Sequence, residues 1–226
     1  MRTHSGPRTR ETSPRRGAPG RPAGPQPAKR QAILEAAVAV FLREGYARAS
    51  VDVIADEARV SKQTVYNHFG DKQSLFIAAV EGERRRVAEG FAPGAAAGPD
   101  DGTERDARAE LTAFGHRVLQ VLLDERASAL RRLVIAEVAR HPWLRPACAE
   151  GEPRQLVSAL AETLRHRDAR GELSVPDPET GARQFVALLV QQGLHQSMYG
   201  TRPLTGGEAA DICEQAAELF VRAYRR

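Results

Sequence analysis

The sequence predicts an all-α protein in which a small N-terminal helix-turn-helix unit precedes a larger helical domain. From residue 29 onward, apolar residues recur at helical spacing and no stretch alternates as a strand would. Aromatic residues make up only 5% of the 226 residues, so the core must depend on Leu, Val, Ile and Ala, which favours helices. We expect a disordered arm over residues 1–28, a helix-turn-helix domain over 29–81 and a second domain over 82–226.

The N-terminal arm differs in composition from the rest of the chain. It is rich in Arg, Pro, Gly and Ser and has no apolar period. Such a segment cannot bury enough surface to offset the entropy lost on ordering, so we expect disorder. Residues 1–90 carry a net charge of +6 and residues 91–226 a net charge of −2. The positive end would meet a phosphate backbone, and a solvated basic tail explains the charge equally well.

Short helices with clear end signals follow the arm. The first runs over 29–44 and stops at Gly45, and its apolar stripe is Ile33, Leu34, Ala37, Val38 and Phe41. Ser50 is a good N-cap for a helix over 51–58, which ends in a tight break at Arg59 and Val60. Ser61 then caps a helix over 62–69 that ends at Gly70, and Asp71 caps a helix reaching Glu89.

The rest of the chain reads as a loop followed by longer helices. Residues 90–104 are rich in Gly, Pro, Ala and Asp and are predicted to form a poorly ordered loop. Helical spacing then predicts helices over 105–124, 127–140, 154–170, 179–199 and 207–224. The last two have apolar faces and a short connection containing Pro203. Two such helices from each of two subunits could form a four-helix dimer interface, or they could be ordinary core helices.

The helix over 62–69 has the properties of a DNA reader. The major groove is about 12 Å wide and admits one helix, held by a second helix that crosses behind it. Burying this helix needs only Val65 and Phe69. Lys can donate to guanine, Gln can pair with adenine, and hydroxyls and a further Lys can bond phosphates. The candidate DNA contacts are Ser50, Ser61, Lys62, Gln63, Thr64, Tyr66, Asn67, His68 and Lys72.

The same residues resemble a known family. Residues 60–75 satisfy the pattern VS..T.Y.HF..K..L of the TetR/AcrR regulators at every specified position. Residues 33–37, Phe41, Gly45, Tyr46 and the Ile54–Ala55 pair resemble the upstream part of that domain. The resemblance implies a homodimeric transcriptional regulator that binds a palindromic operator in double-stranded DNA. It favours a repressor released by a small molecule, while activation stays open because the sign depends on operator position.

One residue departs from the family pattern. Members usually have Gly in the turn between the two DNA-binding helices, where this chain has Arg59. If this position needs a positive φ, a residue with a Cβ is uncommon and mildly strained there. Arg59 could instead add a phosphate contact.

The C-terminal domain resembles the AefR-like branch of the family over 132–144, 171–173, 177–179 and 182–185. This resemblance implies an effector-binding and dimerisation domain of about six helices. We expect an unknown, largely apolar effector to lie among the central helices. Lone His and Gln residues on helices are, however, more often satisfied core or interface residues. The candidate pocket residues are Phe114, His116, Arg117, Glu137, Trp143, Gln191, Gln192, His195 and Met198.

Other classes of protein leave no signal. Cys148 and Cys213 are far apart, with no CxxC motif and no His at metal spacing, so we expect no disulfide framework, metal or cofactor. No run of about 18 apolar residues predicts a membrane span, and no secretory signal follows the basic N-terminus, so we expect the cytoplasm. Hydrolase, nucleotide-binding and metalloprotease motifs are absent, so we expect no enzyme. An architectural DNA binder that uses the basic arm stays an alternative.

Overall fold

The computed structural model describes residues 26–89, 106–146 and 154–225, which are almost entirely helical. The elements are α1 (Gln26–Arg48), α2 (Val51–Glu57), α3 (Lys62–Phe69), α4 (Lys72–Glu89), α5 (Ala107–Leu122), α6 (Glu125–Val138), the 3₁₀ helix η1 (Pro142–Leu144), α8 (Arg154–Ala169), α9 (Pro178–Gln196) and α10 (Gly206–Tyr224). Residues 1–25 of the arm expected over 1–28, and the loop expected over 90–104, lie outside the described residues. The last three residues of that arm are helical, because α1 begins three residues earlier than expected.

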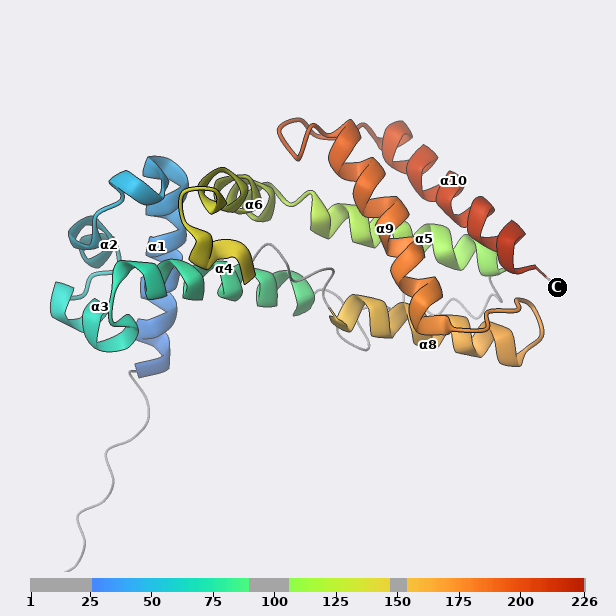
Figure 1. Cartoon of the computed structure of the whole chain (residues 1–226), viewed down its shortest axis with the longest axis horizontal. Helices are drawn as coiled ribbons and strands as arrows, with labels where there is room; N and C mark the ends of the chain where they lie inside the picture. The colour runs from blue at the N-terminus through green and yellow to red at the C-terminus, as the bar shows by residue number, and fades with distance from the viewer. Residues whose placement is uncertain (1–25, 90–105, 147–153, 226) are drawn as a thin grey trace, which may run out of the picture.

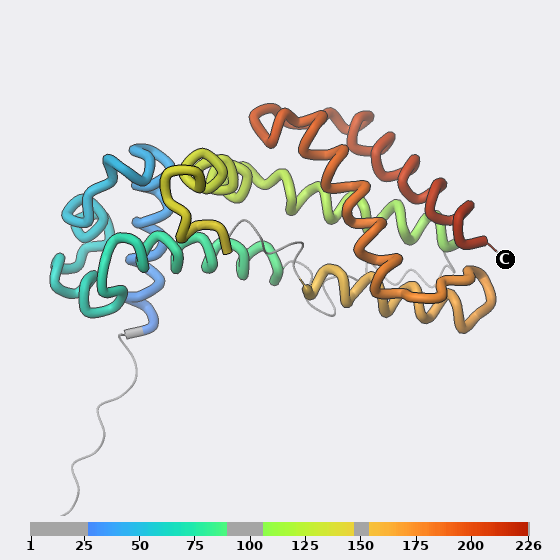
Figure 2. The backbone as a smooth tube through the Cα atoms, viewed as in Figure 1, coloured from blue at the N-terminus to red at the C-terminus, as the bar shows by residue number. Residues whose placement is uncertain are grey.

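The helices form two groups at opposite ends of an elongated molecule (Figures 1 and 2). Helices α1, α2 and α3 lie at one end, and α4 extends from them toward the middle. Helices α5, α8, α9 and α10 form the other end, with α10 packed against both α5 and α9. Helix α6 follows α5 in the chain but contacts α1 and α4. The molecule therefore has two hydrophobic cores instead of one.

The N-terminal core draws on more than the first four helices. It is centred on Phe41 and Phe76, whose ring centroids lie 4.8 Å apart. Leu130 and Val134 of α6 and Leu144 of η1 are buried in the same cluster. The domain boundary expected at residue 81 falls inside α4, and α6 and η1 of the expected second domain pack on the first. Removing those two elements would expose apolar surface of the N-terminal core.

The C-terminal core lies among α5, α8, α9 and α10. Phe185 of α9 is fully buried, and its ring lies 5.4 Å from that of Phe220 on α10. The end of α10 is bonded to the connection between α8 and α9, because the Ser174 N–H donates to the Tyr224 carbonyl over 2.7 Å. An isolated antiparallel bridge joins Leu173 and Arg225 beside it. These contacts hold the chain end against the body of the domain.

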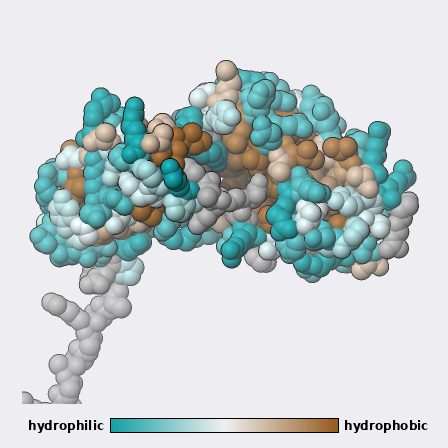
Figure 3. Space-filling model, viewed as in Figure 1, coloured by the Kyte–Doolittle hydropathy of each residue, from teal (hydrophilic) through white to brown (hydrophobic). Residues whose placement is uncertain are grey.

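Glycine and short polar residues end the helices much as expected. Gly45 has a φ of 77° and a ψ of 161°, so the first helical run breaks there, and one further turn continues to Arg48. The short helix η1 was not anticipated. Figure 3 shows mostly hydrophilic residues over the N-terminal end, with hydrophobic residues in the middle of the molecule and along the C-terminal end. Across the described helices, none combines the length and hydropathy needed to cross a lipid bilayer.

Candidate nucleic-acid interface

Helix α3 is fixed at both ends by local hydrogen bonds. The Ser61 Oγ accepts from the Thr64 N–H over 3.1 Å, which is the expected N-cap. At the other end, the Gly70 N–H donates to the Tyr66 carbonyl over 2.8 Å, and Gly70 takes a φ of 79°. The helix spans Lys62–Phe69, as the sequence predicts. An eight-residue helix with defined ends suits a groove that admits one short helix.

Helix α2 supports α3 from behind. Its residues Val51, Ile54 and Ala55 are buried in the N-terminal core. In the turn to α3, the Val60 N–H donates to the Ala55 carbonyl over 3.0 Å, and Arg59 has a φ of 54°. This position does need the left-handed region, so the departure from glycine places a strained Arg in the turn.

The polar residues of α3 differ in how far they reach solvent. Val65 and Phe69 are the buried residues of the helix, as predicted. Thr64 and His68 were expected to be free, but both are half-buried. The Thr64 hydroxyl lies 2.8 Å from the Ser61 Oγ, and the His68 ring lies 6.1 Å from that of Phe69. The exposed candidates are Ser61, Lys62, Gln63, Tyr66 and Asn67.

The donors in the first turn of α3 already have partners within the protein. The Lys62 Nζ lies 2.9 Å from the Asp52 Oδ1, which places a cation of α3 against a carboxylate of α2. The Gln63 Nε2 donates to the Asn67 Oδ1 over 2.8 Å, one turn along the helix. Both donors therefore have a defined position before any DNA is bound. The sequence-based prediction named Lys62, Gln63 and Asn67 but not Asp52.

Lys72, which is a predicted DNA-backbone contact, is held by two groups of the protein. Its Nζ donates to the Ala47 carbonyl over 3.0 Å and lies 4.9 Å from the centre of the Tyr46 ring. Burial lowers the pKa of Lys72 below its ordinary value. The Ala47 carbonyl occupies one of the three donors of the ammonium, so the phosphate contact of Lys72 stays a prediction. Ser50, the other candidate outside α3, is half-buried and accepts from the Asp52 N–H over 3.2 Å.

A further cation lies near the end of α3. The Arg30 guanidinium on α1 lies 5.1 Å from the centre of the Phe69 ring, on exposed surface. This is a cation–π contact between helices that are far apart in the sequence. No local pattern could have related Arg30 to Phe69, whereas Asp52 could have been noticed as an acid in the first turn of the support helix.

The residues expected to line an effector pocket do not share one site. Phe114 of α5 is buried in the C-terminal core, with the Arg117 guanidinium 5.5 Å from the centre of its ring. His116 on the same helix is exposed. The candidates at the end of the chain face mostly outward: Gln191, His195 and Met198 are exposed and Gln192 is half-buried.

Two other pocket candidates lie at the N-terminal end. The Glu137 carboxylate is 3.6 Å from the His141 Nε2. The Trp143 ring lies 5.3 Å from that of Tyr46 and 6.2 Å from that of Phe76. Both therefore belong with the N-terminal core. The effector site stays a prediction about the C-terminal domain, without a residue set that the structure brings together.

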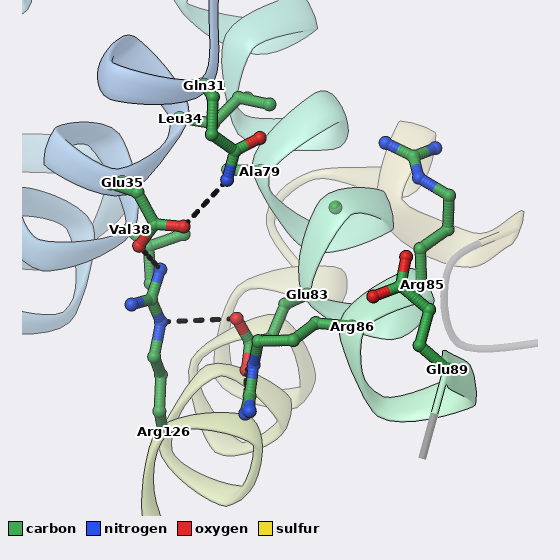
Figure 4. A pocket seen from close by; sticks show the side chains of 11 residues that line it. Gln31, Leu34, Glu35, Val38, Ala79, Glu83, Arg85, Arg86, Glu89 and Arg126 are labelled. Carbon is green, nitrogen blue, oxygen red and sulfur yellow. Dashed lines mark hydrogen bonds and ion pairs between the residues drawn. The ribbon is translucent and has the colours of Figure 1, made fainter. Parts of the chain in front are cut away.

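A charged pocket of about 290 Å³ lies where α1, α4 and α6 meet (Figure 4). Its buried carboxylate, Glu83, is 5% exposed and pairs with Arg86 over 2.6 Å and with Arg126 over 3.1 Å. Arg126 also reaches Glu35 on α1 over 2.5 Å, and Arg86 reaches Asp124 over 2.7 Å. Asp124 is the N-cap of α6. This ion-pair network joins α1 and α4 to the start of α6.

Cys213 is the one cysteine among the described residues. Cys213 is buried in the C-terminal core, and burial raises the pKa of its thiol to about 12. Cys148 lies outside the described residues. Within 26–89, 106–146 and 154–225, no three His, Cys, Asp or Glu residues are placed to hold a metal ion.

Comparison with known protein families accounts for both ends of the molecule. Residues 33–79 match the family described as bacterial regulatory proteins, tetR family. Residues 109–226 match the AefR-like transcriptional repressor, C-terminal domain. The chain belongs to the TetR family. TetR-family proteins are non-enzymatic DNA-binding regulators, so this chain is a transcriptional regulator and not an enzyme.

Two relatives of this TetR-family regulator match different lengths of it. The HTH-type transcriptional repressor SCO4008 of Streptomyces coelicolor is 51% identical over 49 residues, which are 22% of this chain and 26% of that protein. The chain thus matches about a quarter of the length of SCO4008. An uncharacterised HTH-type transcriptional regulator of Mycobacterium bovis, Mb1581, is 32% identical over 157 residues, which are 68% of this chain and 71% of that protein.

Solved structures extend the likeness to nearly the whole fold. A TetR-family transcriptional regulator from Mesorhizobium loti matches with a TM-score of 0.75 and 28% identity, over 88% of this chain and 98% of that one. The flavonoid-responsive regulator FrrA matches with a TM-score of 0.67 and 26% identity over the same shares. Both structures therefore resemble the two ends of this TetR-family chain together.

Proposed function

We propose that this TetR-family regulator is a repressor that binds a palindromic operator as a homodimer and is released by a small molecule. The observation that carries the DNA-binding part is the capped, outward-facing α3 with its supporting α2. Lys62, Gln63 and Tyr66 are exposed on one short helix. Lys62 and Gln63 lie in its first turn, which is the turn that meets base edges in helix-turn-helix complexes.

The proposed dimer uses α9 and α10. The two helices lie side by side at the C-terminal end (Figure 1). Leu219 on α10 is an exposed large apolar residue, and the outer face of α9 carries the exposed Gln191 and His195. A two-fold axis through these helices would give a four-helix interface. It would also set two α3 helices about 34–36 Å apart, in successive major grooves.

The proposed effector binds the C-terminal domain and favours a different spacing of the two α3 helices. Support comes from the AefR-like match over residues 109–226 and from the flavonoid response named for FrrA. For this chain we propose a small, largely apolar molecule, without assigning its class further. The site of action that fits a regulator of this kind is the cytoplasm.

Genomic footprinting of the bound chain, followed by gel shifts on the recovered sites, tests the DNA-binding part. We expect a palindromic site bound about 10³-fold or more tighter than random duplex at fixed salt. Gln63→Ala should change base preference at one step, whereas Gln73→Ala, an exposed glutamine on α4, should not. Equal affinity for every duplex would contradict the proposal and favour an architectural binder.

Two further measurements test the remaining parts of the proposal. Sedimentation of the chain with and without operator should give a dimer, and a monomeric chain on a half-site would contradict dimeric binding. Deleting the gene should raise transcription beside the footprinted sites, and lowered transcription would indicate an activator. If no small molecule changes operator affinity, ligand release fails while DNA binding stands.

A further inference from the structure

Asp52 places a negative charge next to the first residue of α3, the recognition helix of the proposed function. It is in the first turn of α2, its side chain is 61% exposed, and its carboxylate lies 2.9 Å and 3.0 Å from the Lys62 Nζ. The pair connects the start of α2 to the start of α3 on exposed surface. It therefore lies on the part of the molecule that meets DNA in the proposed function.

A carboxylate in this place is costly for general DNA affinity. Duplex DNA is densely negative, and non-specific binding depends almost entirely on cations that neutralise phosphates. Asp52 repels phosphates and offsets the charge of Lys62. An exposed ion pair contributes little to folding stability, so stability alone does not account for the pair. Its hydrogen bond also raises the pKa of Lys62, which stays charged.

The pair restricts the position of a flexible cation. Lys carries a compact charge on a four-carbon stem and, when unrestrained, can reach any nearby phosphate. Held by Asp52, the Lys62 Nζ stays over the first turn of α3. Gln63 beside it is held in the same way by Asn67. The two donors expected to read bases thus each have a single partner that sets their position.

We propose that Asp52 is a positioning residue for base reading, which holds Lys62 at the start of α3 and withholds it from phosphates of random DNA. The inference rests on the proposed function and adds the source of its sequence specificity. On the operator, Lys62 reaches its base edge from the position that Asp52 sets. On random duplex, the neutralised pair adds little affinity, so the ratio of the two affinities rises.

The test compares Asp52→Asn with Asp56→Asn, using purified full-length chain, the footprinted operator and a scrambled duplex. Asp56 is exposed on the same helix and carries the same charge, but it is not part of the Asp52–Lys62 pair. Affinities are measured by fluorescence anisotropy over a series of salt concentrations. Thermal melts of both variants establish that each is folded.

We expect Asp52→Asn to bind scrambled duplex about fivefold to tenfold tighter at about 0.1 M salt, with a salt slope steeper by about 0.9 for each freed Lys62. Operator affinity should change less than about twofold, so the specificity ratio falls. Adding Lys62→Ala to Asp52→Asn should remove the gain on scrambled duplex. Asp56→Asn should change both affinities by one small, common factor.

Two results would overturn the inference. One is an equal gain on operator and scrambled duplex for Asp52→Asn, which would make Asp52 a general negative charge. The other is the same loss of specificity in Asp56→Asn, because that residue does not hold Lys62. A wild-type chain that binds both duplexes equally would instead defeat the proposed function, and it is recognised before any variant is measured.

Discussion

The two ends of the molecule differ in what organises their functional residues. At the DNA-binding end, the candidates lie on one eight-residue helix whose ends are set by Ser61 and Gly70. At the C-terminal end, the pocket candidates come from several helices, and the fold separates Phe114 from Trp143 into different cores. A site on one capped helix depends on local chemistry, whereas a site between helices depends on packing that only the whole fold determines.

The largest expected effect tests whether the two hydrophobic cores unfold separately. Phe76→Ala removes a fully buried ring that packs on Phe41 and Tyr46. We expect it to lower the free energy of unfolding by about 3–5 kcal/mol. Trp143, the only tryptophan, contacts Phe76, so its fluorescence reports the N-terminal core, while circular dichroism reports all helices. The fluorescence midpoint should fall below the circular dichroism midpoint.

Phe185→Ala is the matched change in the C-terminal core, where the Phe185 ring is equally buried. It should lower the circular dichroism midpoint more than the Trp143 midpoint. Coincident midpoints in both variants would contradict two separate cores and indicate one cooperative unit.

The next effect concerns the joint between the ends. Glu83→Gln leaves the Arg86 and Arg126 guanidinium groups without their buried carboxylate. Removing one partner of a buried pair is costly, but both arginines are partly exposed, so we expect a loss of about 1–3 kcal/mol in urea unfolding. Glu89→Gln on the exposed side of the pocket should change stability by less than about 0.5 kcal/mol. Equal losses in the two variants would remove the special role of Glu83.

A smaller effect, of opposite sign, is expected in the turn of the DNA-binding end. Arg59→Gly relieves a left-handed φ of 54° and should stabilise the fold by about 0.5–1 kcal/mol. Arg59→Ala keeps the Cβ and serves as the control, since it should give no such gain. If Arg59 also contacts phosphate, both variants should flatten the salt dependence of DNA binding by about 0.9 per subunit. A glycine variant no more stable than the alanine variant would contradict the strain.

The smallest effect is a pH dependence at the start of α10. Arg202 and the capping box with Thr205 hold the pKa of Glu208 at about 2, below its ordinary value of 4.5. Because the folded-state pKa is depressed, this group stabilises the fold above pH 4.5, and the contribution is lost as the pH falls toward 2. Glu208→Gln should lower the melting temperature at neutral pH and leave less acid sensitivity. An unchanged acid sensitivity would contradict this role.

Sequence alone anticipated the regular parts of this fold closely. The bounds of α3 were predicted to the residue because Ser61 and Gly70 act through bonds to their own helix. The sequence left open whether the turn needs a positive φ at Arg59, and the structure has a φ of 54° there. The sequence-based prediction missed the extension of α1 past Gly45. A glycine that only kinks a helix and a glycine that ends one give the same local sequence pattern.

Contacts between segments that are distant in the sequence could not be predicted from local sequence patterns. Lys72 was predicted as a DNA-backbone contact from its residue type, whereas its contacts with the Ala47 carbonyl and the Tyr46 ring arise from the packing of α4 on α1. The pairing of Asp52 with Lys62 depends in the same way on the angle between α2 and α3. In both cases the residue type alone predicted a charged side chain. Its partner could be identified only once the packing of the helices was known.

The main-chain bond between Ser174 and Tyr224 bears on how the protein can be handled. This bond joins the last turn of α10 to the connection between α8 and α9. An affinity tag attached directly to the end of α10 would therefore disturb a contact of the C-terminal core. A chain truncated before Tyr224 would lose this main-chain bond and the hydrogen bond that the Tyr224 hydroxyl donates to the Gln184 Oε1. Immobilisation through the N-terminal end leaves both hydrogen bonds of Tyr224 intact.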